Sequence, residues 1–324
     1  MSDTLVLLDH ATDGSLRAPV RELVTIARDL PGAVRGVWVA DGAEPSPATI
    51  AELGVLGVTH VHRLVADGDL HVAAALAAGL ATLLAETGAH LVLAVSTFEN
   101  KEAAGHLAVA SGAAVVTDVD SVVWSDERLV AGKTVFAGTW TTSTAVRTPL
   151  AVITVKPNSV PVTDAPEPVT PQVGDHAVAL DAGVGRVRLV ERTEQPASDR
   201  PDLTSAHVVV VGGRGTEGDF SSVEELADVL GGAVGATRVA TDEGWIGHEA
   251  QIGQTGVTIS PRLYIGAGVS GAVHHRGGMQ ASGTIVAVNS DPDAPIFEIA
   301  DFGVVGDLRT VLPQAAAELR RLKG

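Results

Sequence analysis

The sequence predicts an α/β protein made of two doubly wound domains with mainly parallel sheets, the second of them Rossmann-like. Three observations lead to this fold class. Apolar strand-like runs alternate with helical runs in both halves of the chain, a pattern typical of parallel sheets covered by helices. Residues 191–203 form a polar, proline-containing segment without periodicity, which indicates a domain linker. Two glycine-rich turns follow strand-like runs in the second half.

The first domain is expected to span residues 1–200. Its strand-like runs lie at residues 5–8, 34–40, 59–64, 91–96 and 114–117, with helical runs at residues 19–30, 70–87 and 99–110. Helices disappear between residues 122 and 155, where four short strands joined by Gly and Thr turns are expected. The proline-rich residues 156–171 predict an extended connection, and residues 184–190 predict one further strand.

The second domain is expected to span residues 204–324. Its strands are predicted at residues 207–211, 233–236, 262–265 and 284–289, and its helices at residues 219–230, 270–280 and 306–322. Arg238 follows the second of these strands, so its guanidinium is expected at the strand end, where doubly wound sheets bind their ligands.

Composition excludes several classes of protein. The formal net charge of −17 disfavours nucleic acid as a partner, because a phosphate backbone would be repelled. The absence of cysteine excludes disulfides, thiolate metal sites and a cysteine nucleophile. The first residues read as a strand rather than a signal peptide, and no apolar run is long enough for a membrane span. A cytoplasmic protein is therefore expected.

Two segments follow the G-x-G-x-x-G pattern, at residues 213–218 and 266–271. Glycine allows backbone N–H groups to approach a pyrophosphate, and the helix that follows presents partial positive charge. One such match is weak evidence in a chain with 36 glycines. Two matches in one domain favour a dinucleotide.

Acidic residues are missing from one stretch of this acidic chain. Residues 250–290 contain no Asp or Glu but keep two arginines and two histidines. An anionic ligand would explain this distribution. A buried part of the sheet, where any charge is unfavourable, would explain it as well. His60 and His62 point the same way on one strand, but without a further ligand they do not make a metal site.

A dense, ordered series of motifs runs from Val208 to the end of the chain. In order, they are Gly212-Gly213-Arg214-Gly215, Val234-Gly235-Ala236-Thr237-Arg238, Gln251-Ile252-Gly253-Gln254-Thr255-Gly256, Leu263-Tyr264-Ile265-Gly266, Val269-Ser270-Gly271-Ala272-Val273-His274-His275, Gly278-Met279, Ile285-Val286-Ala287-Val288-Asn289, Asp293-Ala294-Pro295-Ile296-Phe297 and Ala300-Asp301-Phe302-Gly303-Val304-Val305-Gly306-Asp307-Leu308. By these motifs the chain resembles the α subunit of electron-transfer flavoproteins. The first half fits the family's first domain in pattern only.

The resemblance implies FAD in the second domain. It places Arg214 and Ser270 against the pyrophosphate, and Asn289 and Asp307 at the adenosine end. The other residues that it brings to the cofactor are Thr237, Arg238, Ile252, Gly253, Gln254, Thr255, Gly271, Ala272, Val273, His274 and His275.

Four of these residues are expected at the flavin ring itself. The resemblance implies that the Thr237 hydroxyl lies close to the flavin and that Arg238 lies over the ring. It further implies that the Thr255 hydroxyl lies near N5 and that His275, rather than His274, approaches O2. An arginine and a histidine there would stabilise the negative charge that reduction places near N1 and O2.

The resemblance also implies a function and partners. The protein would carry single electrons from flavoprotein dehydrogenases, typically of acyl-CoA type, to a quinone oxidoreductase, with no substrate turnover of its own. It would work as a heterodimer with a β subunit that holds AMP. Trp245, Ile246 and Met279 are expected on exposed loops beside the cofactor, where the β subunit would cover them.

Two other functions stay open at the level of sequence. An NAD(P)-dependent oxidoreductase would use residues 213–218 as its fingerprint and Asp242 as the acid that binds the ribose. A nucleotide-binding regulator without redox chemistry would use the same glycine turns. A visible flavin spectrum separates the first function from both alternatives.

Overall fold

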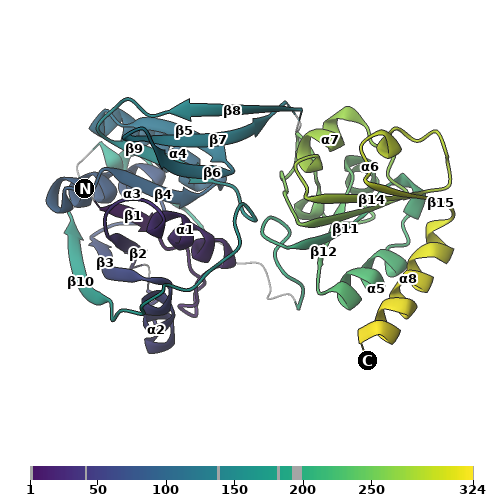
Figure 1. Cartoon of the computed structure of the whole chain (residues 1–324), viewed down its shortest axis with the longest axis horizontal. Helices are drawn as coiled ribbons and strands as arrows, with labels where there is room; N and C mark the ends of the chain where they lie inside the picture. The colour runs from purple at the N-terminus through teal and green to yellow at the C-terminus, as the bar shows by residue number, and fades with distance from the viewer. Residues whose placement is uncertain (1–2, 41, 137–138, 181–182, 192–198, 324) are drawn as a thin grey trace. The chain divides into compact units, whose positions relative to one another are not determined.

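The computed structural model describes every residue except 1–2, 41, 137–138, 181–182, 192–198 and 324. The chain forms two compact units (Figure 1). The first comprises Met1–Lys133 and Thr142–Glu194, and the second comprises Thr134–Thr141 and Gln195–Gly324. Of the predicted linker, residues 192–198 lie outside the described residues, and the domain boundary stays a prediction.

The first unit alternates strands and helices up to residue 119 and continues with strands, of which residues 134–135 and 140–141 are assigned to the second unit. Its elements are β1 (Thr4–Leu7), α1 (Ala18–Arg28), β2 (Val34–Val39), α2 (Pro47–Leu56), β3 (Val58–Ala66), α3 (Ala73–Thr87), β4 (Leu91–Val95), α4 (Phe98–Ser111), β5 (Ala114–Val119), β6 (Ser121–Ser125), β7 (Arg128–Val135), β8 (Trp140–Ala145), β9 (Ala151–Val155), β10 (Gln172–Val178) and the 3₁₀ turn η1 (Val184–Arg186).

The large sheet of this unit has the strand order β10-β3-β2-β1-β4-β9-β5, and all its pairings are parallel. From β1 the chain builds the sheet first toward β3 and then, from β4, in the other direction. The topological switch point therefore lies between β1 and β4. Strands β6, β7 and β8 form a separate sheet, in which β6 and β7 are antiparallel.

Helices cover both faces of the large sheet. Val20 and Leu23 of α1 and Leu53 of α2 belong to one buried cluster. Leu80 of α3 and Leu107 of α4 belong to the cluster on the opposite face. This arrangement confirms the doubly wound fold that the alternating pattern predicts.

One prediction for the first unit is wrong, and two of its elements were not predicted. No strand forms over residues 184–190, where Val184–Arg186 is a 3₁₀ turn. The edge strand is instead β10, which pairs with β3 although Gly174 and Asp175 are poor strand formers. The helix α2 was not predicted, yet Ser46 caps it by accepting a hydrogen bond from the Thr49 N–H.

The second unit carries a smaller parallel sheet. Its elements are β11 (Val208–Gly212), η2 (Arg214–Thr216), α5 (Ser221–Leu230), β12 (Ala233–Ala236), α6 (Arg238–Asp242), η3 (His248–Ala250), β13 (Leu263–Ala267), α7 (Val273–Met279), β14 (Thr284–Asn289), η4 (Pro295–Glu298), β15 (Phe302–Val305) and α8 (Leu308–Lys323).

The strand order is β12-β11-β13-β14-β15, again with parallel pairings only. The switch point of this unit lies between β11 and β13, which pair directly. Leu226 of α5 and Leu312 of α8 pack on one face, and Met279 of α7 and Ile296 of η4 on the other. The second unit is therefore doubly wound as well, as predicted. Among the described residues, no helix is both long and apolar enough to cross a membrane.

Candidate functional site

The two glycine turns meet at the switch point of the second unit. The Gly213 N–H donates to the Ala267 carbonyl, and the Gly215 N–H donates to the Gly268 carbonyl, each over 3.0 Å. A Cβ atom on Gly213 would lie 2.4 Å from the Gly268 oxygen. These glycines therefore allow two backbones to touch. The N–H groups of Gly213 and Gly215 are used between the turns, contrary to the simple expectation that glycine N–H groups face a phosphate.

The second turn does leave donors for a ligand. In the part of the chain that the structure describes, no acceptor pairs with the backbone N–H groups of Ser270, Gly271 and Ala272. Gly271 has φ 81°, and a Cβ atom there would lie 2.4 Å from the Ile296 nitrogen, so only glycine fits. Three unpaired N–H groups in a row at the carboxyl edge of a parallel sheet suit an anion.

Two side chains stabilise this turn through hydrogen bonds to its backbone carbonyls. Arg276 Nε donates to the Gly271 carbonyl over 2.6 Å, and its guanidinium also pairs with Glu298 over 2.9 Å. Asn289, at the end of β14, donates from Nδ2 to the Val269 carbonyl over 2.9 Å. Arg276, which lies in the acid-free stretch 250–290, therefore stabilises the turn. Arg214 is exposed at the start of η2 and has no ion pair among the described residues.

Among the described residues of the site, Thr237 carries a buried hydroxyl group without a hydrogen-bond partner. This residue follows β12 in the N-cap position of α6, but its side chain caps no backbone N–H. The Thr237 side chain is buried, and within the described part of the chain its Oγ1 has no hydrogen-bond partner. A buried hydroxyl without a partner is unfavourable, so a ligand atom at this position would stabilise it.

Arg238 is the first residue of α6 and lies beside the same strand end. Its side chain is 63% exposed, and Nε lies 3.1 Å from Asp242 Oδ2. The pair is an i, i+4 contact along one helix, which is weak in water. Arg238 is therefore tied to Asp242 in this structure while most of its surface stays accessible.

The loop after η3 forms a tight turn beside β12. The Ile252 N–H donates to the Ala236 carbonyl over 2.9 Å, and the Gly253 N–H donates to the Val257 carbonyl over 3.1 Å. Gln254 Oε1 lies 2.8 Å from His274 Nδ1, so this loop contacts the start of α7. Gln251 Nε2 donates to the Thr255 hydroxyl over 3.0 Å. The loop thus brings Gln254 and Thr255, both exposed, to the carboxyl edge.

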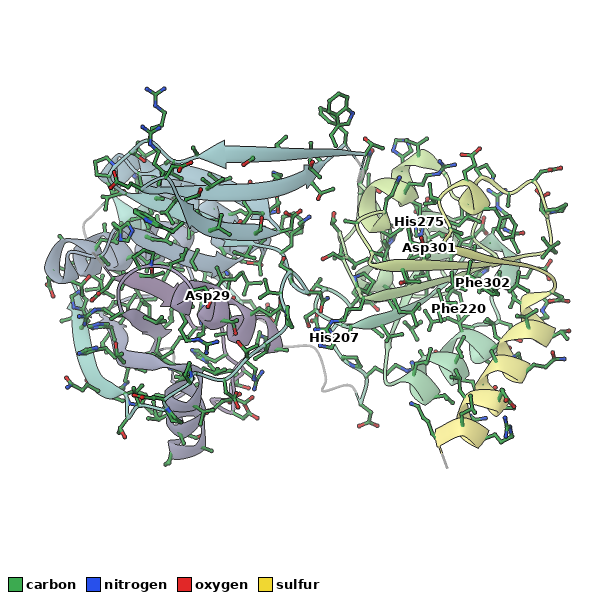
Figure 2. The ribbon with its side chains drawn as sticks, in the orientation of Figure 1. Asp29, His207, Phe220, His275, Asp301 and Phe302 are labelled. Carbon is green, nitrogen blue, oxygen red and sulfur yellow. The ribbon has the colours of Figure 1, made fainter. Side chains whose placement is uncertain are left out.

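The two adjacent histidines have opposite environments. His274 is exposed, whereas its neighbour His275 on α7, labelled in Figure 2, is buried. His275 Nδ1 lies 3.0 Å from the Ile252 carbonyl, which can only accept, so Nδ1 carries the proton. His275 Nε2 then accepts from the Tyr264 hydroxyl over 2.8 Å. Burial lowers the pKa of His275 to about 4, so the imidazole is neutral at physiological pH.

The residues expected at the adenosine end lie at the ends of the last strands. Asn289 Oδ1 accepts from the Asp291 N–H over 3.0 Å, so both ends of its amide have partners within the chain. Asp307 lies just before α8, and its Oδ1 accepts from the Arg309 N–H over 2.9 Å. Both residues lie at the carboxyl edge of the sheet. Asp307 caps α8, whereas Asn289 stabilises the turn that follows β13.

One expectation about exposed loops is wrong. Met279 has no exposed surface, because it is the last residue of α7 and packs into the buried cluster under that helix. Trp245 and Ile246 are half-buried and pack against the cluster beneath α5 and α8. They therefore form no exposed apolar loop that would indicate a covering subunit.

Sequence reasoning missed roles for Tyr264, Gln251 and Arg276. Tyr264 is the single tyrosine of the chain and is fully buried on β13. A buried tyrosine in a strand signals a partner for its hydroxyl, which here is His275. The identity of that partner depends on strand register and could not be predicted.

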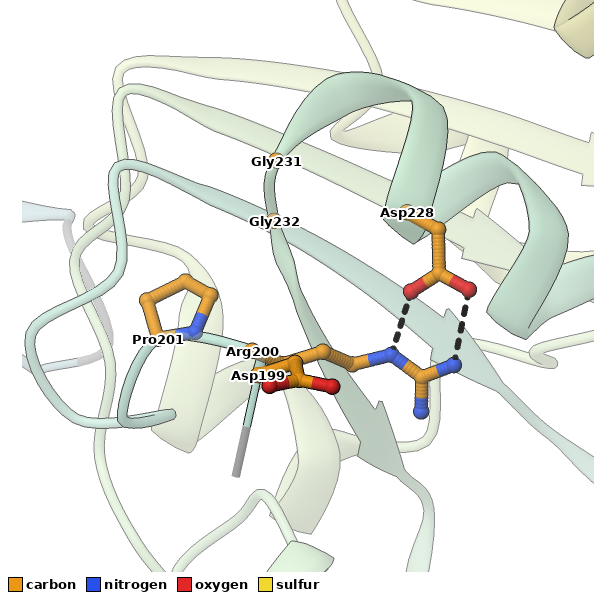
Figure 3. A pocket seen from close by; sticks show the side chains of 6 residues that line it. All are labelled: Asp199, Arg200, Pro201, Asp228, Gly231 and Gly232. Carbon is orange, nitrogen blue, oxygen red and sulfur yellow. Dashed lines mark hydrogen bonds and ion pairs between the residues drawn. The ribbon is translucent and has the colours of Figure 1, made fainter. Parts of the chain in front are cut away.

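A pocket elsewhere on the second unit does not coincide with this site. It is lined by Asp199, Arg200, Pro201, Asp228, Gly231 and Gly232 (Figure 3). Arg200 holds Asp228 of α5 through two contacts, of 2.6 and 3.1 Å. Gly231 and Gly232 precede β12, so the pocket lies at the amino edge of the sheet, opposite to the glycine turns.

Comparisons with known proteins identify relatives along the whole chain. Residues 4–190 match the family described as electron transfer flavoprotein domain, and residues 202–280 match the electron transfer flavoprotein FAD-binding domain. The chain is 41% identical to an electron transfer flavoprotein subunit alpha of Mycobacterium leprae over 100% of both chains. It is 43% identical to the protein of the same name from Mycobacterium tuberculosis, again over 100% of both.

A more distant relative supports the same assignment. The electron transfer flavoprotein subunit alpha of Paracoccus denitrificans is 36% identical over 97% of this chain and 99% of its own. The similarity therefore includes the first unit, whose sequence carries few motifs.

Proposed function

Because the chain belongs to the electron transfer flavoprotein family, as an alpha subunit, we propose that it binds FAD at the carboxyl edge of its second sheet and carries single electrons. We further propose that its donors are flavoprotein dehydrogenases of acyl-CoA type and that its acceptor is a quinone oxidoreductase. In this function the chain turns over no substrate of its own. A cytoplasmic location stays a prediction.

One observation carries the proposal for the cofactor site. The buried Thr237 hydroxyl and the N–H groups of Ser270, Gly271 and Ala272 lack partners within the described residues, and all follow strands at one edge of the sheet. Polar groups left without partners in this way suit a ligand that carries both a phosphate and a polar ring. FAD has both. The turn Ser270–Ala272 would hold the pyrophosphate of FAD, together with Arg214 of the first glycine turn.

The remaining residues would act on the flavin and the adenosine. Thr237 and Thr255 offer hydroxyls, Arg238 offers a charge, and Ile252, Gly253 and Gln254 form the loop between them. FAD, when bound, supplies the one-electron chemistry. The chain's own contribution is to orient the ring, to exclude part of the water and to stabilise negative charge. Asn289 and Asp307 would lie toward the adenosine, and Val273 and His274 at the start of α7.

The resemblance brings His275 to the flavin. Both of its nitrogens have partners within the chain, Tyr264 and Ile252. A direct contact with FAD would require one of these bonds to be exchanged. Its contact with FAD stays a prediction. The contacts present in this structure instead join α7, β13 and the loop after η3 that contains Ile252.

The proposed partner is the electron transfer flavoprotein β subunit, in a heterodimer whose β subunit holds AMP. The relatives' designation as subunit alpha supports an assembly with a second kind of chain. Met279 is buried and offers no surface to this partner.

The alternative nicotinamide cofactor has less support. Asp242, its expected ribose acid, lies on α6 and pairs with Arg238 rather than standing at the end of β12, where Thr237 stands. The first glycine turn uses two of its N–H groups against the second turn. Both features remove contacts that a nicotinamide dinucleotide would need.

The test is the absorption spectrum of the chain purified together with its β subunit. The complex is expected to be yellow and to release FAD, not FMN, on denaturation. A colourless complex that binds NADH would overturn the proposed function.

A further inference from the structure

We propose that Gln251 is a positioning residue that fixes the direction of the Thr255 hydroxyl, so that Thr255 donates its proton to an acceptor atom of the bound cofactor. This inference rests on the proposed FAD site and adds a buried relay to it. The relay runs from Thr241 through Gln251 to Thr255, all within the second unit.

Gln251 is held on every side. Its side chain is buried, its N–H donates to the His248 carbonyl over 3.0 Å, and its carbonyl accepts from the Val257 N–H over 2.8 Å. A Cβ atom on residue 256 would lie 2.1 Å from the Gln251 oxygen, so Gly256 allows this close turn. The amide therefore has a fixed backbone and little freedom to move.

The lengths of its two contacts set the orientation of the amide. Gln251 Oε1 lies 2.7 Å from Thr241 Oγ1, the usual length for an O–H donor to a carbonyl oxygen. Gln251 Nε2 lies 3.0 Å from Thr255 Oγ1, the usual length for an N–H donor. Thr241 Oγ1 has a second possible acceptor, the Arg238 carbonyl at 3.0 Å, but the shorter contact takes the single hydroxyl proton.

The direction of this relay determines what Thr255 can offer. Because the Thr255 oxygen accepts from Gln251, its own proton points away from Gln251, and no other described residue accepts it. Thr255 is exposed at the carboxyl edge, on the loop beside Thr237. A ligand there meets a hydroxyl that donates. An oxidised isoalloxazine ring has ring nitrogens and carbonyl oxygens that accept.

The Thr255 hydroxyl therefore stabilises a cofactor atom as long as that atom carries no proton and can accept a hydrogen bond. Once the atom gains a proton it becomes a donor, and its proton would face the proton of Thr255. If Gln251 presented an acceptor instead of Nε2, the Thr255 hydroxyl would turn inward and the preference would be reversed.

The experiment uses the complex of the chain with its β subunit and compares Gln251→Glu with the wild type. A carboxylate only accepts, so it draws the Thr255 proton inward. We expect about tenfold weaker binding of oxidised FAD, the loss of one hydrogen bond of about 1.4 kcal/mol. We also expect the potential of the first electron to depend more steeply on pH than in the wild type. Gln280→Glu, at the end of α7 with no side-chain hydrogen bond described, is the matched control and should change FAD affinity less than twofold.

A double-mutant cycle separates the relay from the added charge. In a Thr255→Val background there is no hydroxyl to orient, so Gln251→Glu should lose most of its effect on FAD affinity. Thr241→Val should weaken FAD binding by about threefold through the freed amide, and Thr241→Ser should restore it. These milder variants decide the matter if the glutamate variant does not assemble.

Equal effects of Gln251→Glu with and without the Thr255 hydroxyl would overturn the inference, as would a Thr255→Val variant that binds oxidised FAD like the wild type. The second result would mean that Thr241 donates to Arg238 and the relay runs the other way. A wild-type complex without FAD would instead overturn the proposed function. The two failures are therefore distinguishable.

Discussion

The two units share a topology but treat the carboxyl edge of their sheets differently. In the first unit, Asn100 Nδ2 fills the switch point between β1 and β4 and donates to Asp9 over 3.0 Å and to the Val95 carbonyl over 3.1 Å. In the second unit, the turn Ser270–Ala272 and the Thr237 hydroxyl keep polar groups without partners among the described residues. A doubly wound sheet thus offers a ligand site only where its edge leaves polar groups unpaired.

The charge of Asp9 is a second difference between the carboxyl edges of the two units. Burial raises the pKa of Asp9 to about 6, although the hydrogen bond from Asn100 acts in the opposite direction. At pH 7 this carboxylate is mostly ionised and would repel a phosphate. The N–H of Asn100 at the start of α4 is capped by the Thr97 hydroxyl over 3.1 Å. We therefore expect no nucleotide at the switch point of the first unit.

The largest effect is expected from adding one methyl group to the glycine turns. Gly213→Ala would force the Gly268 carbonyl away, since the Cβ atom would lie 2.4 Å from its oxygen. We expect a loss of about 3 kcal/mol or more in the free energy of unfolding, together with loss of FAD. Gly105→Ala in α4, where a Cβ atom meets open space, is the control and should stabilise by about 0.5–1 kcal/mol. Chemical unfolding of both complexes measures this, and equal stability of the two variants would contradict the backbone contact.

The buried His275 should make the second unit sensitive to acid. Burial lowers its pKa to about 4 in the folded state, whereas the ordinary value is 6.5. The unfolded chain binds the proton more tightly, so stability falls as the pH drops from 6.5 toward 4, by up to about 3 kcal/mol. His275→Gln removes the titration and should flatten the dependence over this range. Urea unfolding at several pH values checks it, and an unchanged slope in the variant would show that another group titrates.

Asp9, which is half-buried, should act in the opposite direction in the first unit. Its folded pKa of about 6 exceeds the ordinary value of 3.8, so stability falls as the pH rises between these values. Asp9→Asn should therefore stabilise the first unit by at most about 3 kcal/mol at pH 8 and by nothing at pH 3. A variant that is less stable than the wild type at pH 8 would mean that the Asp9 charge has a stabilising partner. The unfolding free energies at the two pH values decide it.

A smaller effect is expected from the Arg238 charge on the cofactor. Because Arg238 is 63% exposed and pairs with Asp242, water and Asp242 offset part of its charge. We expect Arg238→Ala to lower the potential of the first electron by about 50 mV, which corresponds to about 1.2 kcal/mol for one electron. Asp242→Asn frees the guanidinium and should raise the same potential. Spectroelectrochemistry on the flavinated complexes measures both potentials. If Arg238→Ala binds FAD more weakly but leaves the potential unchanged, Arg238 only stabilises α6 through its pair with Asp242.

The sequence predicts elements well where periodicity and glycine turns are local. The strands β11 and β14 and the helices α5 and α8 follow from such patterns and are confirmed. The strand β10 does not, because its seven residues include Gly174 and Asp175 and it forms only by pairing with β3.

The details of the site depend on contacts between distant segments. The use of the Gly213 and Gly215 N–H groups depends on the register of β11 against β13, which no local pattern encodes. The burial of His275 depends on where α7 begins, and its tautomer depends on Ile252, 23 residues earlier. The resemblance implies that Thr237 belongs to the site, but its lack of a hydrogen-bond partner is visible only once β12 and α6 are placed.

The most direct test of this account asks where FAD protects the chain. Hydrogen–deuterium exchange of the complex with its β subunit would be compared before and after removal of FAD. We expect FAD to slow exchange at residues 269–273 and 252–257 of the second unit and to leave residues 9–10 and 96–100 of the first unit unchanged. Protection at the β1–β4 edge, with none at the glycine turn of the second unit, would contradict the claim that unpaired polar groups mark the cofactor site.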